Sequence, residues 1–350
     1  MPEPTCVLVM APNWLGDAVM ALPALADLRR HFAGARLVVA ARASIAPLYA
    51  LVPGVDEVVT LQWRGGLLRR RSMHADAERL RAVGAAVAIL FPNSFAAAWL
   101  VNTAGVADRW GYASDWRRPL LTRAVRRVRR SQHQGAYYQT LVRELGAPVG
   151  PLEPRLEIPA TVTAAARQLL SERGWDATRP LMVVAPGAAY GTAKRWLPSH
   201  FARLVDTWSR ERGLQCVMVG SAADRETTQW ILGLLDASIR RAAIDLAGVT
   251  SLETLAGVLG LAAVCVSNDS GAMHLAGAAG VPLAALFGPT REYETAPLVR
   301  QGGRAEVLIH PVWCRPCMLR ECPIDHRCMK GLQPEQVSGA VARLLGSAAS

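Results

Sequence analysis

Lysine is almost missing from this sequence. Of 39 basic residues in 350, only Lys194 and Lys330 are lysines, so arginine supplies nearly all of the positive charge. Basic residues outnumber the 28 acidic ones and give a formal net charge of +11. Because enrichment in arginine and alanine can follow from nucleotide composition alone, this charge is only modest evidence for phosphate-rich partners such as nucleic acid, nucleotides or an anionic membrane.

The sequence also lacks a long uninterrupted apolar run. The longest candidate, residues 271–288, contains His274 and Pro282, and the proline divides it into a helix-like half and a strand-like half. We therefore expect no membrane-spanning helix. The first five residues have no basic leader, which disfavours secretion. With 51% hydrophobic residues, the chain shows no signature of disorder and has enough apolar material for two cores.

Two motifs for binding phosphates are absent. The sequence contains no Gly-x4-Gly-Lys-Ser/Thr motif, which excludes a P-loop. It also contains no Asp-x-Asp triplet and no paired carboxylates suited to a magnesium–diphosphate complex. A phosphate site, if there is one, must therefore use other residues.

Cysteine is scarce and unevenly placed. The count of seven is odd, and the first three cysteines lie in apolar strand-like runs, as reduced buried thiols do. We therefore expect a reducing cytoplasm. The other four fall within residues 314–328: Cys314, Cys317, Cys322 and Cys328.

This Cys-rich segment (residues 314–328) has spacing that suits a structural zinc ion, with His326 as a substitute ligand. Only its Cys-x2-Cys half matches common zinc spacing, so a labile disulfide pair or plain reduced thiols remain alternatives. A catalytic zinc is disfavoured because four thiolate ligands leave no open position for substrate.

Short β-branched runs alternate with amphipathic stretches in two series, which predicts an α/β protein with two Rossmann-like halves. We expect domains at residues 1–160 and 178–350, joined by a linker with a bridging helix at 161–177. The first series has strands at 6–11, 36–41, 55–61 and 85–91 and a helix at 18–32. The second has strands at 181–185, 215–220, 244–247, 263–267 and 282–287, and helices at 199–212, 223–235, 251–261 and 272–279.

Loops after parallel strands are the first place to search for chemistry, and a cleft between two such domains is the expected active site. Asp17 follows the first strand at the start of a helix. It is either an ordinary residue of a helix N-terminus or a general base that removes a proton from an attacking hydroxyl.

The second half carries two such loops. Lys194 follows a Gly-rich loop and, with Thr192, suits a diphosphate, although a lysine can also stand there by chance. Asp269, Ser270 and Gly271 open a helix whose amides suit phosphate or sugar, with His274 on its inner face. Alternatively, Asp269 and Ser270 cap this helix and His274 is a core residue. Residues 287–290 end the next strand and should line the same opening.

A dense basic run occupies residues 117–130 and includes Arg126 and Arg127. It is either a solvated helix face or a landing surface for membrane phospholipid or a phosphorylated acceptor. Nucleic acid is less favoured because no aromatic residues are grouped with the run. A zinc-stabilised nucleic-acid-binding protein is also disfavoured, because the basic residues beside the Cys-rich segment are interspersed with Glu321 and Asp325.

Four motifs together resemble those of the bacterial lipopolysaccharide heptosyltransferase family, over nearly the whole chain. They are Pro-Asn-Trp-Leu-Gly-Asp at 12–17, Leu-Phe-Pro-Asn-Ser-Phe at 90–95, Pro-Gly-Ala at 186–188 with Ala-Lys-Arg-Trp at 193–196, and Asn-Asp-Ser-Gly-x-Met-His at 268–274. The likeness is greatest to members that add the second heptose. Residues 322–328 are similar to the tail of a subset of the family.

The resemblance implies a GT-B fold and inverting transfer of L-glycero-D-manno-heptose from ADP-heptose to the inner core on lipid A. It implies that the N-terminal domain holds the acceptor and the C-terminal domain the nucleotide sugar. It assigns the base to Asp17 and the diphosphate to Thr192 and Lys194. Donor contacts would come from Asp224, Asp269, Ser270, Gly271 and His274, with Glu226 as the alternative to Asp224 at the ribose. Acceptor or membrane contacts would come from Asn13, Asn93, Arg126 and Arg127.

By the same resemblance the enzyme needs no cofactor for catalysis, binds no nucleic acid and works in the cytoplasm, in peripheral contact with the inner membrane. A structural zinc is the only metal expected. The alternative within the fold is another nucleotide-sugar transferase or a sugar epimerase.

Overall fold

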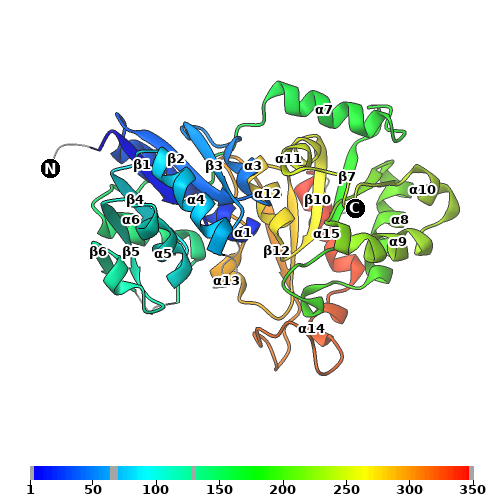
Figure 1. Ribbon diagram of the computed structural model, residues 1–350. Helices are drawn as coiled ribbons and strands as arrows, with labels where there is room; N and C mark the ends of the chain where they lie inside the picture. Colours follow the sequence, from blue (N-terminus) through cyan, green and yellow to red (C-terminus); the bar gives the residue numbers. More distant parts are fainter. Residues whose placement is uncertain (1–3, 64–69, 128–130, 347–350) are drawn as a thin grey trace. The chain divides into compact units, whose positions relative to one another are not determined.

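A computed structural model describes residues 4–63, 70–127 and 131–346. The chain divides into two compact units, Met1–Glu157 and Ile158–Ser350. Each unit is built on one six-stranded sheet flanked by helices (Figure 1). In the described part of the chain no helix is long and apolar enough to cross a membrane.

The sheet of the first unit has the strand order β3-β2-β1-β4-β5-β6, and all of its pairs are parallel. Its central strand β1 is buried along its whole length, as expected for a parallel sheet covered on both faces. The strands are β1 (Cys6–Met10), β2 (Arg36–Arg42), β3 (Glu57–Leu61), β4 (Val87–Leu90), β5 (Asp108–Ala113) and β6 (Arg123–Arg126). The helices are α1 (Leu15–Met20), α2 (Leu22–His31), α3 (Ala46–Tyr49), α4 (Arg70–Ala82), α5 (Phe95–Thr103) and α6 (Gln134–Glu144).

The structure corrects two expectations in this unit. The predicted helix at 18–32 is two helices, which separate at Ala21 just before Pro23, a residue with no N–H to continue the bonding of α1. The basic run is not a helix. Its described part forms a 3-10 turn, η2 (Arg118–Leu120), followed by the edge strand β6, while residues 128–130 lie outside the described residues.

The sheet of the second unit has the order β12-β11-β10-β7-β8-β9 and is also fully parallel. Its strands are β7 (Leu181–Ala185), β8 (Gln215–Met218), β9 (Ile244–Asp245), β10 (Ala262–Asn268), β11 (Leu283–Phe287) and β12 (Ala305–Ile309). Its helices are α7 (Ala160–Ser171), α8 (Pro198–Arg212), α9 (Arg225–Leu234), α10 (Ala237–Ala242), α11 (Leu252–Gly260), α12 (Gly271–Ala279), α13 (Glu292–Thr295), α14 (Arg327–Lys330) and α15 (Pro334–Leu344), with 3-10 turns η3 (Thr192–Lys194) and η4 (Ala222–Asp224).

Helix α7, at the predicted linker, packs within the second unit against α11. The two helices approach closely at Gly257, where a Cβ atom would lie 2.9 Å from the Cβ of Ala166. Glycine at this position therefore permits the contact.

Candidate active site

A charged cluster lies at the carboxyl ends of three strands of the second unit. The Asp269 carboxylate follows β10, and its Oδ2 atom accepts hydrogen bonds from Lys194 Nζ and Thr290 Oγ1, each at 2.6 Å. The side chains of Lys194 and Asp269 are only 12% and 5% exposed. A nearly buried charge without a partner is strongly unfavourable, so Lys194 and Asp269 stay paired. The hydrogen bond from Thr290 to the same carboxylate then holds all three side chains in one arrangement.

Asn268, the last residue of β10, fastens the Lys194 loop to the sheet. Its Oδ1 atom accepts from the backbone N–H of Trp196 at 3.0 Å, and its Nδ2 atom donates to the carbonyl of Pro186 at 2.7 Å. Trp196 is itself buried in the core of this unit. These two bonds tie the residues before and after η3 to Asn268, and they therefore fix the position of Lys194.

The start of α12 completes this edge of the sheet. Ser270 is the N-cap, and its Oγ atom accepts from the backbone N–H of Met273 at 3.4 Å. Gly271 is the first helical residue, and His274 is buried in the helix at 3% exposure. Thr192, in contrast, is exposed at the start of η3, where its hydroxyl can reach a ligand. Ser270 therefore has the capping role that was one of its two interpretations.

Asp224 is engaged by its own loop. Its Oδ2 atom accepts from the backbone N–H of Ser221 at 2.9 Å and from the Ser221 hydroxyl at 2.7 Å. Its Oδ1 atom lies 3.6 Å from the Arg195 guanidinium. A Cβ atom on Gly187 would lie 2.4 Å from the carboxyl carbon, so the glycine makes room for it. Glu226, the alternative ribose contact, is exposed in the first turn of α9.

In the first unit, Asp17 lies half-buried in the first turn of α1, after β1. Two buried tyrosines lie close enough to Asp17 for its charge to change the pKa of their hydroxyl groups. Burial and, after it, the negative charge of Asp17 raise the pKa of Tyr49 and of Tyr138 well above the usual tyrosine range. Both phenols are therefore neutral at physiological pH, so Asp17 lies near two uncharged side chains.

Asn93 lies in the loop after β4, the strand next to β1. Its Nδ2 atom donates to the Tyr137 hydroxyl at 2.9 Å, and its carbonyl accepts from Ser114 Oγ at 3.1 Å. Asn13 is half-buried in the loop between β1 and α1. The strand order thus brings the loops of Asp17 and Asn93 to neighbouring positions on one edge of the sheet.

The basic run divides into structural and exposed arginines. Arg117 is fully buried, donates from Nε to the carbonyl of Tyr112 at 2.9 Å, and has its pKa lowered to about 10 by burial. Arg123 donates to the carbonyls of Leu145 and Glu144 at the end of α6. Arg126 and Arg127 are exposed, with the Arg127 guanidinium 5.9 Å from the ring centre of Tyr137. An anionic ligand can therefore reach these two arginines, and it can also reach Arg118, which is exposed as well.

The four cysteines of the Cys-rich segment are free thiols, and Cys328 is the buried one. Burial, and to a lesser degree the charges of the other three cysteines, raise the pKa of the Cys328 thiol. In the part of the chain that the structure describes, no three cysteine, histidine or acidic side chains are arranged to hold a metal ion. The side chains as placed therefore do not fit zinc, which stays a prediction from spacing.

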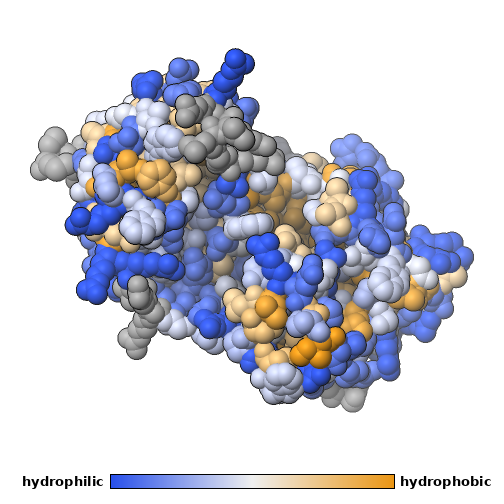
Figure 2. Space-filling model, turned by 60° about the horizontal axis from the view of Figure 1, so that its bottom comes forward, coloured by the Kyte–Doolittle hydropathy of each residue, from blue (hydrophilic) through white to orange (hydrophobic). Residues whose placement is uncertain are grey.

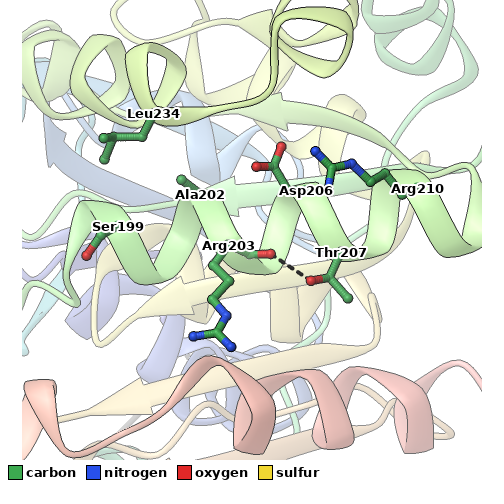
Figure 3. A pocket seen from close by; sticks show the side chains of 7 residues that line it. All are labelled: Ser199, Ala202, Arg203, Asp206, Thr207, Arg210 and Leu234. Atoms are coloured by element: carbon green, nitrogen blue, oxygen red, sulfur yellow. Dashed lines mark hydrogen bonds between the residues drawn. The ribbon is translucent and has the colours of Figure 1, made fainter.

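A separate hollow lies on α8 of the second unit, lined by Asp206, Arg210 and Leu234 (Figure 3). Arg210 donates to Asp236 at 2.8 Å, which offsets its charge. Residues predicted from the sequence as site residues do not line it, so its position does not favour a catalytic role.

Comparison with known proteins places these features in context. Residues 73–327 match the family described as glycosyltransferase family 9 (heptosyltransferase). Lipopolysaccharide heptosyltransferase 2 of Salmonella typhimurium is 32% identical over 309 residues, covering 83% of this chain and 85% of that protein. Lipopolysaccharide heptosyltransferase 1 of Pseudomonas aeruginosa is 31% identical over 330 residues, covering 90% and 87%.

The fold is also similar to a solved structure. The structure of ADP-heptose LPS heptosyltransferase II from Escherichia coli has a TM-score of 0.83 and 27% identity to this chain. The likeness covers 97% of this chain and 98% of that one. Both units therefore have counterparts there.

Proposed function

The chain belongs to glycosyltransferase family 9, the heptosyltransferases, and within that family we propose that it transfers L-glycero-D-manno-heptose from ADP-heptose to the inner core of lipopolysaccharide. The predicted family and the GT-B fold of two Rossmann-like domains are confirmed. The interdomain cleft and the individual roles of site residues remain part of the proposal.

The proposed reaction is a direct displacement with inversion. A hydroxyl of the acceptor attacks the anomeric carbon of the donor heptose and gives its proton to the Asp17 carboxylate. The bond from that carbon to the β-phosphate oxygen breaks, and ADP leaves with the electron pair. Lys194 and Thr192 stabilise the charge that develops on the departing diphosphate. Each substrate is thus served by residues of its own unit.

The observation that carries this proposal is the cluster of Lys194, Asp269 and Thr290. Asp269 accepts one hydrogen bond from Thr290 and one from Lys194, so the lysine is held rigidly. It lies at the carboxyl edge of a parallel sheet, where such folds bind nucleotides. A cation fixed before the substrate binds needs little reorganisation as the leaving group gains charge. The start of α12 beside it adds the positive end of a helix dipole.

We place the acceptor on the first unit, near Asn13, Asn93, Arg126 and Arg127. We also propose that the sugar added is the second heptose of the inner core. The exposed arginines suit a phosphorylated acceptor and the anionic cytoplasmic face of the inner membrane. Relatives named heptosyltransferase 2 favour the second step, although the relative from Pseudomonas aeruginosa is named heptosyltransferase 1. Asp224 is proposed at the ribose side of the donor loop.

Donor screening separates this proposal from a transferase for another nucleotide sugar or an epimerase. Purified protein is incubated with an inner-core acceptor and either ADP-heptose or a set of UDP-sugars. We expect turnover with ADP-heptose alone. Turnover with a UDP-sugar, or epimerisation without acceptor, would replace the proposed donor and reaction.

A further inference from the structure

The Cys-rich segment touches two of the three loops that hold the Lys194 cluster, those after β7 and β11. It runs between β12 and α14, and its backbone bonds to the loop after β7 through Ala193 N–H, which donates to the carbonyl of Arg320 at 3.0 Å. Met318 contacts both loops: its carbonyl accepts from the Tyr190 hydroxyl at 2.7 Å, and its N–H donates to the carbonyl of Pro289 at 3.0 Å. The segment therefore forms one wall of this site.

Two features show that this contact is tight. A Cβ atom on Gly191 would lie 2.2 Å from the Arg320 carbonyl oxygen, so only glycine lets the two backbones meet. Arg315, nearly buried, donates from Nε to the carbonyl of Gly288 at 2.9 Å and from Nη2 to that of Thr290 at 3.2 Å. The segment thus binds the residues on either side of Pro289, which are Gly288 and Thr290.

This contact brings two cations to one aromatic ring. The Lys194 ammonium lies 4.8 Å from the ring centre of Tyr190, and the Arg320 guanidinium carbon lies 5.2 Å from it. The Lys194 charge is largely offset by Asp269 at 2.6 Å. A diphosphate carries more negative charge than this neutral pair can balance, so a second cation is needed nearby.

Among the described residues, Arg320 differs from the other cations of these loops and of the Cys-rich segment in having no acidic partner. Five of them each lie within 4.0 Å of a carboxylate: Lys194, Arg195, Arg291, Arg315 and Arg327. Within residues 4–63, 70–127 and 131–346, the structure gives no such pair for Arg320, which is exposed. Its charge is therefore available to an anionic ligand.

We propose that Arg320 is the second cation of the diphosphate site, contributed by the Cys-rich segment to the site of Lys194. The proposal rests on the proposed function for the identity of the nucleotide, but its chemistry requires only a diphosphate. Arginine suits the task because its planar guanidinium binds two phosphate oxygens at once. Figure 2 shows the molecule from the side on which α14 lies in Figure 1. Hydrophobic patches lie there among hydrophilic residues, so this surface is not purely polar.

The test compares the variants R320A, R320K and R327A by calorimetric titration with ADP, AMP and inorganic pyrophosphate. The backbone of Arg320, not its side chain, bonds to Ala193, so R320A leaves that contact in place. R327A removes another arginine of the same segment, one that pairs with Asp325 at 3.0 Å. An unchanged melting temperature of all three variants establishes that they fold.

We expect R320A to weaken ADP and pyrophosphate binding about 10- to 100-fold, as loss of a charge-assisted hydrogen bond does, and AMP binding less. R320K should recover part of the affinity, and R327A should bind as the unaltered protein does. Equal ADP affinity in R320A, or an equal loss in R327A, would overturn the inference and leave the proposed function intact.

Titration with UDP, added to the same series, separates the two proposals. Tight binding of pyrophosphate and UDP with weak binding of ADP, and a loss of both in R320A, would support the role of Arg320 and contradict the proposed donor. Failure of the unaltered protein to bind any of these diphosphates would overturn both.

Discussion

The two sheets present charge at their carboxyl ends in different ways. In the second unit, Lys194, Asp269 and Thr290 are nearly buried and joined by two hydrogen bonds of 2.6 Å. In the first unit, Asp17 lies half-buried near neutral tyrosines, and Arg126 and Arg127 are exposed. One edge is fixed before a ligand arrives, whereas the other keeps its charges accessible to solvent.

This difference fits the two ligands that we propose. A nucleoside diphosphate has the same shape in every turnover and gains charge at one place, so a rigid cation is effective there. A lipid-linked acceptor is large and anionic, and exposed arginines attract it over a distance without a fixed geometry. Variants on the two edges should therefore fail in different ways.

The largest effect is expected at Asp17. We predict that D17N lowers kcat roughly 100- to 10,000-fold, the usual contribution of a general base, and leaves ADP affinity within a few-fold. The measurements are steady-state kinetics and ADP titration. E57Q, which removes an exposed carboxylate of the same unit, is the control and should keep full activity. Retained turnover in D17N would remove Asp17 from the mechanism.

Next in size is Lys194. K194A should weaken donor binding and lower kcat about 100- to 1,000-fold, because a donor to the developing charge is lost. It should also lower the melting temperature, since Asp269 stays nearly buried without its cation. K194R should restore only part of the activity. The control is K330A, the exposed second lysine. Normal kinetics in both Lys194 variants would leave Lys194 with a structural role only, as the partner of Asp269.

A smaller effect is expected at Thr290. T290V keeps the shape of the side chain and removes its hydrogen bond to Asp269, a bond worth about 1.5–3 kcal/mol when the acceptor is charged. Because Lys194 still pairs with Asp269, we expect donor affinity to fall about tenfold and acceptor KM to stay unchanged. A change confined to acceptor KM would contradict the assignment of this edge to the donor.

The exposed arginines should give weaker, salt-dependent effects. With about 1 kcal/mol for each basic residue near an anionic surface, R126A/R127A should raise acceptor KM about 30-fold at low ionic strength and less at high salt. ADP affinity should not change. R240A/R241A, on α10 of the second unit, has the same loss of charge and serves as the control. Equal effects from both pairs would show a general charge effect.

The smallest effect on chemistry is expected from metal removal. The spacing of the Cys-rich segment predicts a structural zinc, whose binding free energy would stabilise the fold. Chelation should then lower the melting temperature before it alters kcat. Elemental analysis of protein purified without added metal decides the matter. Far less than one zinc per chain in fully active, stable protein would reduce the cluster to ordinary thiols.

Sequence alone predicted the central strands of both sheets but missed three others. Buried parallel strands such as β1 are continuous apolar runs that stand out in the sequence. The edge strands β6 and β12 have exposed or half-exposed residues, and β5 begins with Asp108 and Arg109. Polar strands of this kind have no such signal, so tertiary pairing decides their structure.

The candidate site could be predicted in part for the same reason. Asp17, Lys194 and Asp269 each follow a strand with a strong apolar signal, so their loops could be found. The pairing of Lys194 with Asp269 depends on β7 lying next to β10, which the sequence does not state. Arg315 and Arg320 were missed as site residues because they reach these loops from more than a hundred residues away from Lys194 along the chain.

One measurement tests the central claim most directly. Purified protein is incubated with ADP-heptose and with inner-core acceptors that carry either no heptose or one heptose, and the products are weighed by mass spectrometry. The account predicts a gain of one heptose on the acceptor that already carries one, with D17N giving far less of this product in the same time. A product from neither acceptor, or only from the acceptor without heptose, would contradict it.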